Sequence, residues 1–144
     1  MLNKSVCRAE HINHVCIAVR DLEDSLSFYK DVFGAEPQED IEEIQDQGVL
    51  AALVRVGGSQ IEFIQPLESS NGVARFIEKN GESVHHICFE VDNLQDKLDS
   101  LDNAGFNLID KTPREGLSGM IAFIHPKSTK GVLYELVDRD GAKR

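Results

Sequence analysis

The sequence predicts an α+β fold in which two tandem βαβββ modules form a curved, cup-shaped mixed sheet. One observation is a repeat: INHVCIAV at residues 12–19 is matched by VHHICFEV at residues 84–91, and half of the 144-residue chain separates the two copies. The other is that helical and then strand patterning follows each copy. A repeat of this length indicates that one supersecondary unit is used twice.

The first module begins with a strand, because residues 12–19 are apolar on both alternating faces. A helix is expected next, since Asp21 is a good N-cap and Gly34 is a typical C-terminal stop. Strand patterns follow, with Gly57-Gly58 as a hairpin turn. The remaining predicted strands of this module are 49–56, 60–65 and one short strand within 37–44.

A short connecting helix is predicted over residues 69–80, ending at Gly81. The second module repeats the order of the first. Its predicted elements are a strand at 84–91, a helix at 93–104, and strands at 106–110, 120–125 and 132–137.

The whole chain, residues 1–144, is expected to be one domain, because 144 residues with 41% hydrophobic content can bury one ordinary core. Its predicted parts are module 1 at about 11–67, the linking helix at about 69–81, and module 2 at about 84–138.

The formal net charge of −10 argues against binding to nucleic acid or to an anionic membrane, since both need a basic surface. No stretch approaches the roughly 20 apolar residues of a membrane span, and no secretory signal is evident. These observations predict a soluble, cytoplasmic protein. The three cysteines have no disulfide or zinc spacing, so we expect reduced thiols lining a core or pocket.

Each module carries one histidine early and one glutamate late: His14 with Glu62, and His86 with Glu135. Side chains alternate across a strand, so these polar residues should lie opposite the bulky apolar face that packs on the helix. If two such sheets join, two imidazoles and two carboxylates meet. That donor set suits a divalent metal in an open octahedral site.

A single histidine in an apolar strand is more often a hydrogen-bonded core residue, and a single strand glutamate usually faces solvent. Recurrence at matched positions favours the metal site, because four separate buried polar groups would be costly. His85 has the opposite strand parity to His86 and is expected to be structural or to support a ligand, as is His11. His125 is expected at a surface or at a pocket rim.

The chain resembles the vicinal oxygen chelate superfamily, which includes glyoxalase I, ring-cleaving dioxygenases and methylmalonyl-CoA epimerases. The resemblance to the epimerases spans about residues 11–138. It is carried by these motifs: INHV at 12–15, QGV at 47–49, IEFIQPL at 61–67, FIEKNGE at 76–82, HHI at 85–87, HPKS at 125–128 and GVLYEL at 131–136. It implies metal ligands at His14, Glu62, His86 and Glu135, with a divalent ion such as Co, Zn, Ni, Mn or Mg.

The epimerase resemblance implies a metal-dependent isomerase acting on methylmalonyl-CoA at C2. A metal that chelates the thioester oxygen and the carboxylate would stabilise the enediolate formed when the C2 proton leaves. Some relatives carry a glutamate base on the strand after Gln-Gly-Val, whereas this chain has Ala51. The catalytic base is then Glu62 or Glu135, acting after partial release from the metal, or a group that the sequence does not identify.

Three alternatives stay open. A glyoxalase I type lactoylglutathione lyase would use the same metal set on a glutathione hemithioacetal. A non-catalytic small-molecule-binding protein of the same fold would commonly lack the complete ligand set. A ring-cleaving dioxygenase would use two histidines and one carboxylate in a longer, four-module chain.

A locally basic stretch provides candidate ligands for the phosphates of an acyl-CoA substrate. An equally plausible explanation is ordinary solvated loop charge. Because each module leaves one side of its sheet exposed, modules must pair within or between chains, and the resemblance implies a homodimer. The predicted substrate-binding residues are Arg114, Lys127, Ser128 and Lys130.

Overall fold

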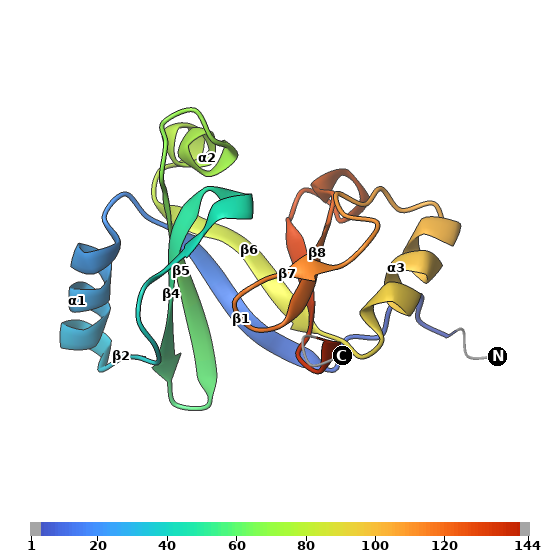
Figure 1. Ribbon diagram of the computed structural model, residues 1–144, viewed down its shortest axis with the longest axis horizontal. Helices are drawn as coiled ribbons and strands as arrows, with labels where there is room; N and C mark the ends of the chain where they lie inside the picture. Colours follow the sequence, from blue (N-terminus) through green and yellow to red (C-terminus); the bar gives the residue numbers. More distant parts are fainter. Residues whose placement is uncertain (1–3, 142–144) are drawn as a thin grey trace. The chain divides into compact units, whose positions relative to one another are not determined.

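The computed structural model describes residues 4–141, in which nine strands and three α-helices alternate along the chain (Figure 1). The strands are β1 (His11–Ala18), β2 (Glu36–Pro37), β3 (Glu42–Ile44), β4 (Val49–Val56), β5 (Ser59–Pro66), β6 (Ser83–Glu90), β7 (Arg114–Glu115), β8 (Met120–Ile124) and β9 (Tyr134–Asp138). The helices are α1 (Leu22–Phe33), α2 (Gly72–Asn80) and α3 (Leu94–Asn103), with two short 3₁₀ turns at Gln45–Gln47 and Pro126–Ser128.

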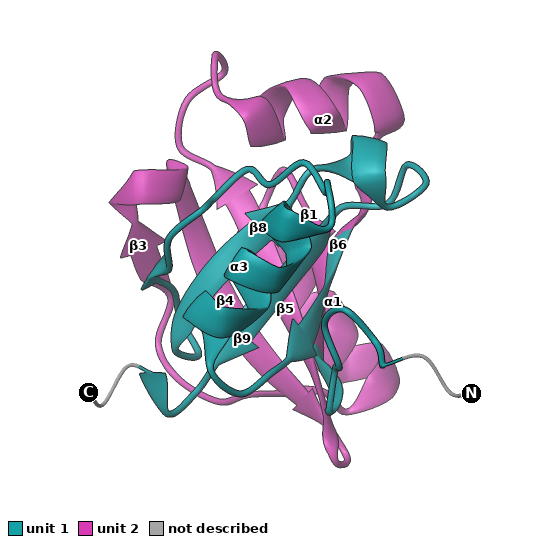
Figure 2. Cartoon of the chain, turned by 90° about the vertical axis from the view of Figure 1, so that its right-hand side faces the viewer, with its two compact units in different colours: residues 1–13, 86–144 teal, residues 14–85 magenta. Residues whose placement is uncertain are grey.

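The chain divides into two compact units (Figure 2). One unit is His14–His85, and the other consists of the chain before and after it. The divisions fall within β1 and β6, the two strands that carry the repeated histidine motif. The prediction of a single domain over residues 1–144 stays a prediction.

In the unit His14–His85, strands run in the order β2-β4-β5-β1, and β3 also pairs with β4. β1 is parallel to β5, whereas β4 is antiparallel to β5. Helix α1 covers one face of this sheet, where Leu22 and Phe63 are fully buried and the ring of Tyr29 lies 4.8 Å from that of Phe63. Burial of each such side chain contributes about 1.5–3 kcal/mol to the stability of the fold. The face beneath α1 is the core of this unit.

The other unit repeats the arrangement with strand order β6-β9-β8-β7. β6 is parallel to β9, and β8 is antiparallel to β9. Helix α3 lies across β8 and β9 (Figure 2) and buries Leu94, Leu98 and Leu101 against Ala122 and Leu136. The predicted order of strand, helix and strands is therefore found in both units.

The predicted ends of α1 and α3 agree with the structure to within one residue. Asp21 caps α1 by accepting a hydrogen bond from the Asp24 amide at 3.0 Å, and Gly34 ends it with a left-handed φ of 67°. A helix end leaves its backbone groups without partners inside the helix. Such capping is local, and local patterns can therefore predict it.

Three predicted elements differ from the structure: the strand at 106–110, the linking helix and the short strand within 37–44. The predicted strand at 106–110 is wrong, since this segment contributes only the isolated bridge of Leu108 with Ile124. The amides of Ile109 and Asp110 both donate to the carbonyl oxygen of Phe123, which prevents the regular alternation of a ladder. The two-residue strand β7 pairs with β8 instead.

The linking helix α2 begins at Gly72, three residues later than predicted. Asn71 is the reason, because its side chain accepts a hydrogen bond from the Ala74 amide at 2.8 Å and caps the helix there. The short strand expected within 37–44 is two strands, β2 and β3, both antiparallel to β4. No helix in the described part of the chain has the length and apolar character needed to cross a membrane.

Candidate metal centre

The first predicted pair, His14 and Glu62, lies in the interior of the unit His14–His85. Glu62 is on β5, directly opposite Cys16 of the parallel strand β1 and Leu53 of the antiparallel strand β4. His14 precedes Cys16 by two residues and so shares its face of the strand. Both side chains are buried, with His14 Nε2 3.8 Å from Glu62 Oε1.

The second pair, His86 and Glu135, has the same construction. Glu135 is on β9, opposite Cys88 of the parallel strand β6 and Phe123 of the antiparallel strand β8. His86 precedes Cys88 by two residues, and its Nε2 lies 3.5 Å from Glu135 Oε1. The histidine, cysteine and glutamate of the sequence repeat therefore occupy equivalent ladder positions in the two units.

Each pair lies on the face of its sheet opposite the helix. Ile17 and Phe63, which have the other strand parity, pack into the core beneath α1. Phe89 and Leu136 do the same beneath α3. The four polar side chains are only 2–6% exposed, so the structure reproduces the predicted sidedness within each unit.

Each pair therefore provides one imidazole nitrogen and carboxylate oxygens in a water-poor setting, and each has members among the described groups that could hold a metal ion. Burying such groups is costly unless they are paired or coordinate a metal. The donor chemistry fits a divalent ion with imidazole and carboxylate ligands.

Cys16 and Cys88 are predicted to be reduced thiols that line a core or pocket. Both are fully buried free thiols, and each lies directly opposite a site glutamate in its ladder. Both also belong to groups that could hold a metal ion. Their recurrence within the repeated motif was the signal that could have marked them as part of the site.

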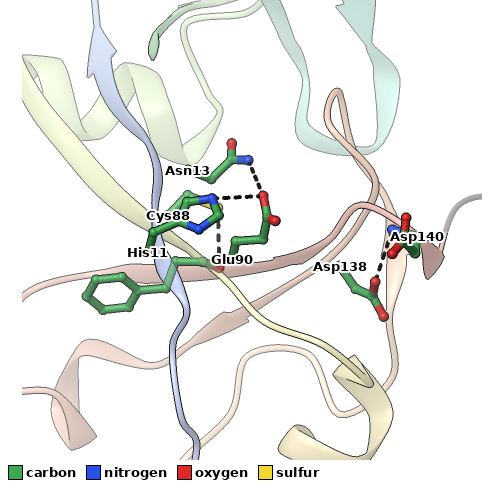
Figure 3. A network of polar contacts seen from close by, with 7 residues as sticks. His11, Asn13, Cys88, Glu90, Asp138 and Asp140 are labelled. Carbon is green, nitrogen blue, oxygen red and sulfur yellow. Dashed lines mark hydrogen bonds and ion pairs between the residues drawn. The ribbon is translucent and has the colours of Figure 1, made fainter. Parts of the chain in front are cut away.

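A polar network links β1 to the end of β6 in the unit that contains His86. Figure 3 shows the exposed His11 and the buried Asn13 directed at one oxygen of Glu90, at 3.3 Å and 3.0 Å. Glu90 follows His86 on β6 by four residues. His11 thus ties strand ends together, in line with the expected structural role.

His85 packs its ring edge-on against Phe76 of α2, 4.8 Å away.

The four predicted substrate-binding residues fall into two groups. Arg114 is only 30% exposed, and its guanidinium carbon lies 5.7 Å from the centroid of the Phe123 ring. Lys127 and Lys130 are exposed in the loop after β8. The Ser128 hydroxyl accepts a hydrogen bond from the Asn107 amide at 2.8 Å, which holds this loop to the segment before β7. Ala51 occupies the position at which some relatives carry a glutamate base. It is fully buried and lies opposite Glu42 of β3.

Comparison with known proteins identifies the family. The model of the glyoxalase/bleomycin resistance protein/dioxygenase superfamily matches residues 13–123. The chain belongs to this superfamily. It is 36% identical over 130 residues to a mitochondrial methylmalonyl-CoA epimerase of Dictyostelium discoideum, covering 89% of this chain and 78% of that protein.

Solved structures of the superfamily confirm the predicted α+β fold. A methylmalonyl-CoA epimerase from Mycobacterium tuberculosis is 35% identical, with a TM-score of 0.86 over 96% of this chain and 92% of that one. A methylmalonyl-CoA epimerase in complex with methylmalonyl-CoA and NH4+ is 31% identical, with a TM-score of 0.87 over 94% and 98%. The chain is therefore related to methylmalonyl-CoA epimerases over nearly its whole length.

Proposed function

We propose that the protein is a metal-dependent isomerase that epimerises methylmalonyl-CoA at C2. The observation that carries the proposal is the duplicated, buried His–Glu pair at equivalent ladder positions of the two units. The relationship to methylmalonyl-CoA epimerases supports the choice of substrate.

In this proposal His14, Glu62, His86 and Glu135 together hold one divalent ion. Two imidazoles and two carboxylates form a donor set that would suit a divalent first-row ion. Bound there, the ion supplies Lewis-acid stabilisation of the negative charge that develops on the substrate oxygens. The ion would be a divalent metal such as Co, Zn, Ni, Mn or Mg.

The reaction needs one proton removed from C2 on one face and one returned on the other. The C2–H bond breaks, its electron pair moves into the thioester as an enediolate, and a carboxylate oxygen takes the proton. Return of a proton to the opposite face gives the other epimer without net redox change. We assign these roles to Glu62 and Glu135, the carboxylates that the duplication provides in matching environments, each acting after partial release from the ion. One would begin ionised and take the proton, and the other would begin protonated and return its own.

Proton NMR of a single methylmalonyl-CoA epimer in deuterated buffer tests this function. Metal-loaded protein should replace the C2 hydrogen with deuterium and produce the other epimer, and chelated protein should do neither above the uncatalysed rate. If metal-loaded protein leaves the C2 hydrogen in place, the epimerase proposal is wrong. The glutathione hemithioacetal, the substrate of the lyase alternative, would then be the next compound to test.

A further inference from the structure

Arg114 contacts the aromatic ring that packs against a candidate metal ligand of its unit. Its guanidinium packs over the ring of Phe123, within the roughly 6 Å range of a cation–π contact. The same Phe123 ring meets the imidazole of His86 edge-on, with centroids 5.2 Å apart and planes at 89°. One aromatic ring therefore separates the guanidinium from a predicted metal ligand.

The strand register places these groups on one face of the sheet. Phe123 is directly opposite Glu135 in the β8–β9 ladder, and opposite residues project to the same side. Because the Arg114 guanidinium covers the ring of Phe123, its charge also lies on the side that carries His86 and Glu135.

Asp110 holds this arginine in place without using all of its donors. Asp110 Oδ1 lies 3.2 Å from Arg114 Nε, and Asp110 Oδ2 accepts a hydrogen bond from the Phe123 amide at 2.9 Å. Within residues 4–141, Asp110 is the only ion-pair partner of Arg114. A guanidinium has five N–H donors in a planar fork, so the donors on its two terminal nitrogens are not used by this ion pair.

We propose that Arg114 binds the free carboxylate of the substrate's malonyl group, in place of the role at the CoA phosphates that the sequence suggested. This inference rests on the proposed function, because it assumes a 2-carboxy thioester at the metal. The planar fork matches a carboxylate with two parallel hydrogen bonds. Arg114 would thereby orient C2 for proton removal and select thioesters that carry a carboxylate.

The position of Arg114 favours the carboxylate over the phosphates. The malonyl carboxylate is bonded directly to C2, whereas the CoA phosphates lie at the far end of the long pantetheine arm. A group one ring away from His86 is thus placed for the reacting end of the substrate. Lys127 and Lys130, in the exposed loop after β8, remain the candidates for the phosphates.

Binding of two CoA thioesters that differ in the carboxylate tests the assignment. Malonyl-CoA carries it and acetyl-CoA does not, and calorimetry would give the dissociation constant of each with wild type, Arg114→Met and Arg114→Lys. Arg114→Met should weaken malonyl-CoA about 10- to 100-fold, the range expected for a charged hydrogen-bonded contact. Acetyl-CoA should change less than about twofold. Arg114→Lys should restore part of the malonyl-CoA affinity.

Arg20→Met is the matched control. Arg20 forms an exposed ion pair with Glu82 at 3.9 Å, and exposed pairs contribute little to stability. The variant removes the same charge and should leave both dissociation constants unchanged. Circular dichroism and thermal unfolding would establish that each variant is folded. If Arg114→Met does not fold, Arg114→Lys still tests the proposal, because it keeps the charge and loses the planar fork.

Equal weakening of malonyl-CoA and acetyl-CoA would mean that Arg114 contacts the shared CoA portion, and no weakening would leave it a structural ion pair. Either result overturns the inference, as would wild-type protein that does not bind malonyl-CoA. Failure of the proposed function is a separate result: wild type would then bind malonyl-CoA selectively through Arg114 yet leave the C2 hydrogen of methylmalonyl-CoA in place.

Discussion

Equivalent residues of the two units have similar surroundings in this protein. Glu62 and Glu135 each lie between a buried cysteine and a large apolar side chain in their ladders. The sequence predicted these glutamates and their histidines because the repeat preserved residue type. It could not separate Arg114 from Lys127 and Lys130, because strand pairing alone brings Arg114 to Phe123.

Removal of one predicted ligand should abolish metal binding and catalysis together. His86→Ala deletes a buried nitrogen donor, so we expect the bound metal to fall well below one ion per chain and C2 exchange to fall by more than about 100-fold. Elemental analysis and deuterium exchange measure the two effects. His11→Ala is the control, because His11 is exposed and contacts Glu90. Full metal content in His86→Ala would exclude His86 as a ligand.

Cys7 should make the folded chain less stable at alkaline pH. Burial against the α3 core raises the pKa of the Cys7 thiol, and the nearby charge of Lys97 opposes this in part. In the unfolded chain the thiol has the ordinary pKa of a cysteine, about 8.5. The stabilising effect is therefore complete below that pH and is lost as the pH rises through the folded-state pKa.

Urea unfolding of wild type and Cys7→Ala at pH 7 and pH 10 tests this effect. The stability of wild type relative to the variant should be lower at pH 10. A difference that stays constant between the two pH values would show that the folded-state pKa of Cys7 is not raised.

At the scale of elements, side-chain caps decide where the helices begin. Asp21 only caps α1, whereas Asn71 caps α2 and also donates to the Gly48 carbonyl at 2.7 Å. The sequence located the first cap because a clear helical pattern follows it. It placed the start of α2 too early, because the decisive contact of Asn71 is with a residue more than twenty positions away.

The double role of Asn71 gives it the larger effect on stability. Asp21→Ala should cost about 1 kcal/mol, and Asn71→Ala about 2 kcal/mol, because it also loses the bond to Gly48. Asn71→Asp keeps the cap but removes the donor, so it isolates the second contribution. Urea denaturation measures all three variants, and equal losses for Asp21→Ala and Asn71→Ala would contradict the double role.

Gly119 is needed because the turn before β8 passes close to the end of β9. Its φ is 148°, and a Cβ there would lie 2.6 Å from the carbonyl oxygen of Asp138. Gly131 also has a positive φ, 94°, but open space around it. Gly119→Ala should therefore cost more than Gly131→Ala, for which about 1–2 kcal/mol of backbone strain is expected. Thermal unfolding tests the order, which similar losses would contradict.

At the scale of the whole molecule, the proposed metal should contribute to stability. A ligand that binds only the folded chain adds about 2.7 kcal/mol at one hundred times its dissociation constant. For a chain of this size that corresponds to a rise of roughly 5–10 °C in Tm. Differential scanning calorimetry with chelator and with added metal measures the shift. His86→Ala should show no such shift, and an equal shift in both proteins would place the metal elsewhere.

The sequence by itself determined the repeated unit, the four candidate metal ligands that recur in it and most element boundaries, because periodicity, capping and duplication are encoded in neighbouring residues. The tertiary structure decided which local patterns form strands. Residues 106–110 form no strand because the amides of Ile109 and Asp110 both donate to the carbonyl oxygen of Phe123, and Arg114–Glu115 pairs with β8 instead. It also decided that Arg114 and His86 contact the same Phe123 ring, since contacts between distant segments depend on strand register, which no local pattern specifies.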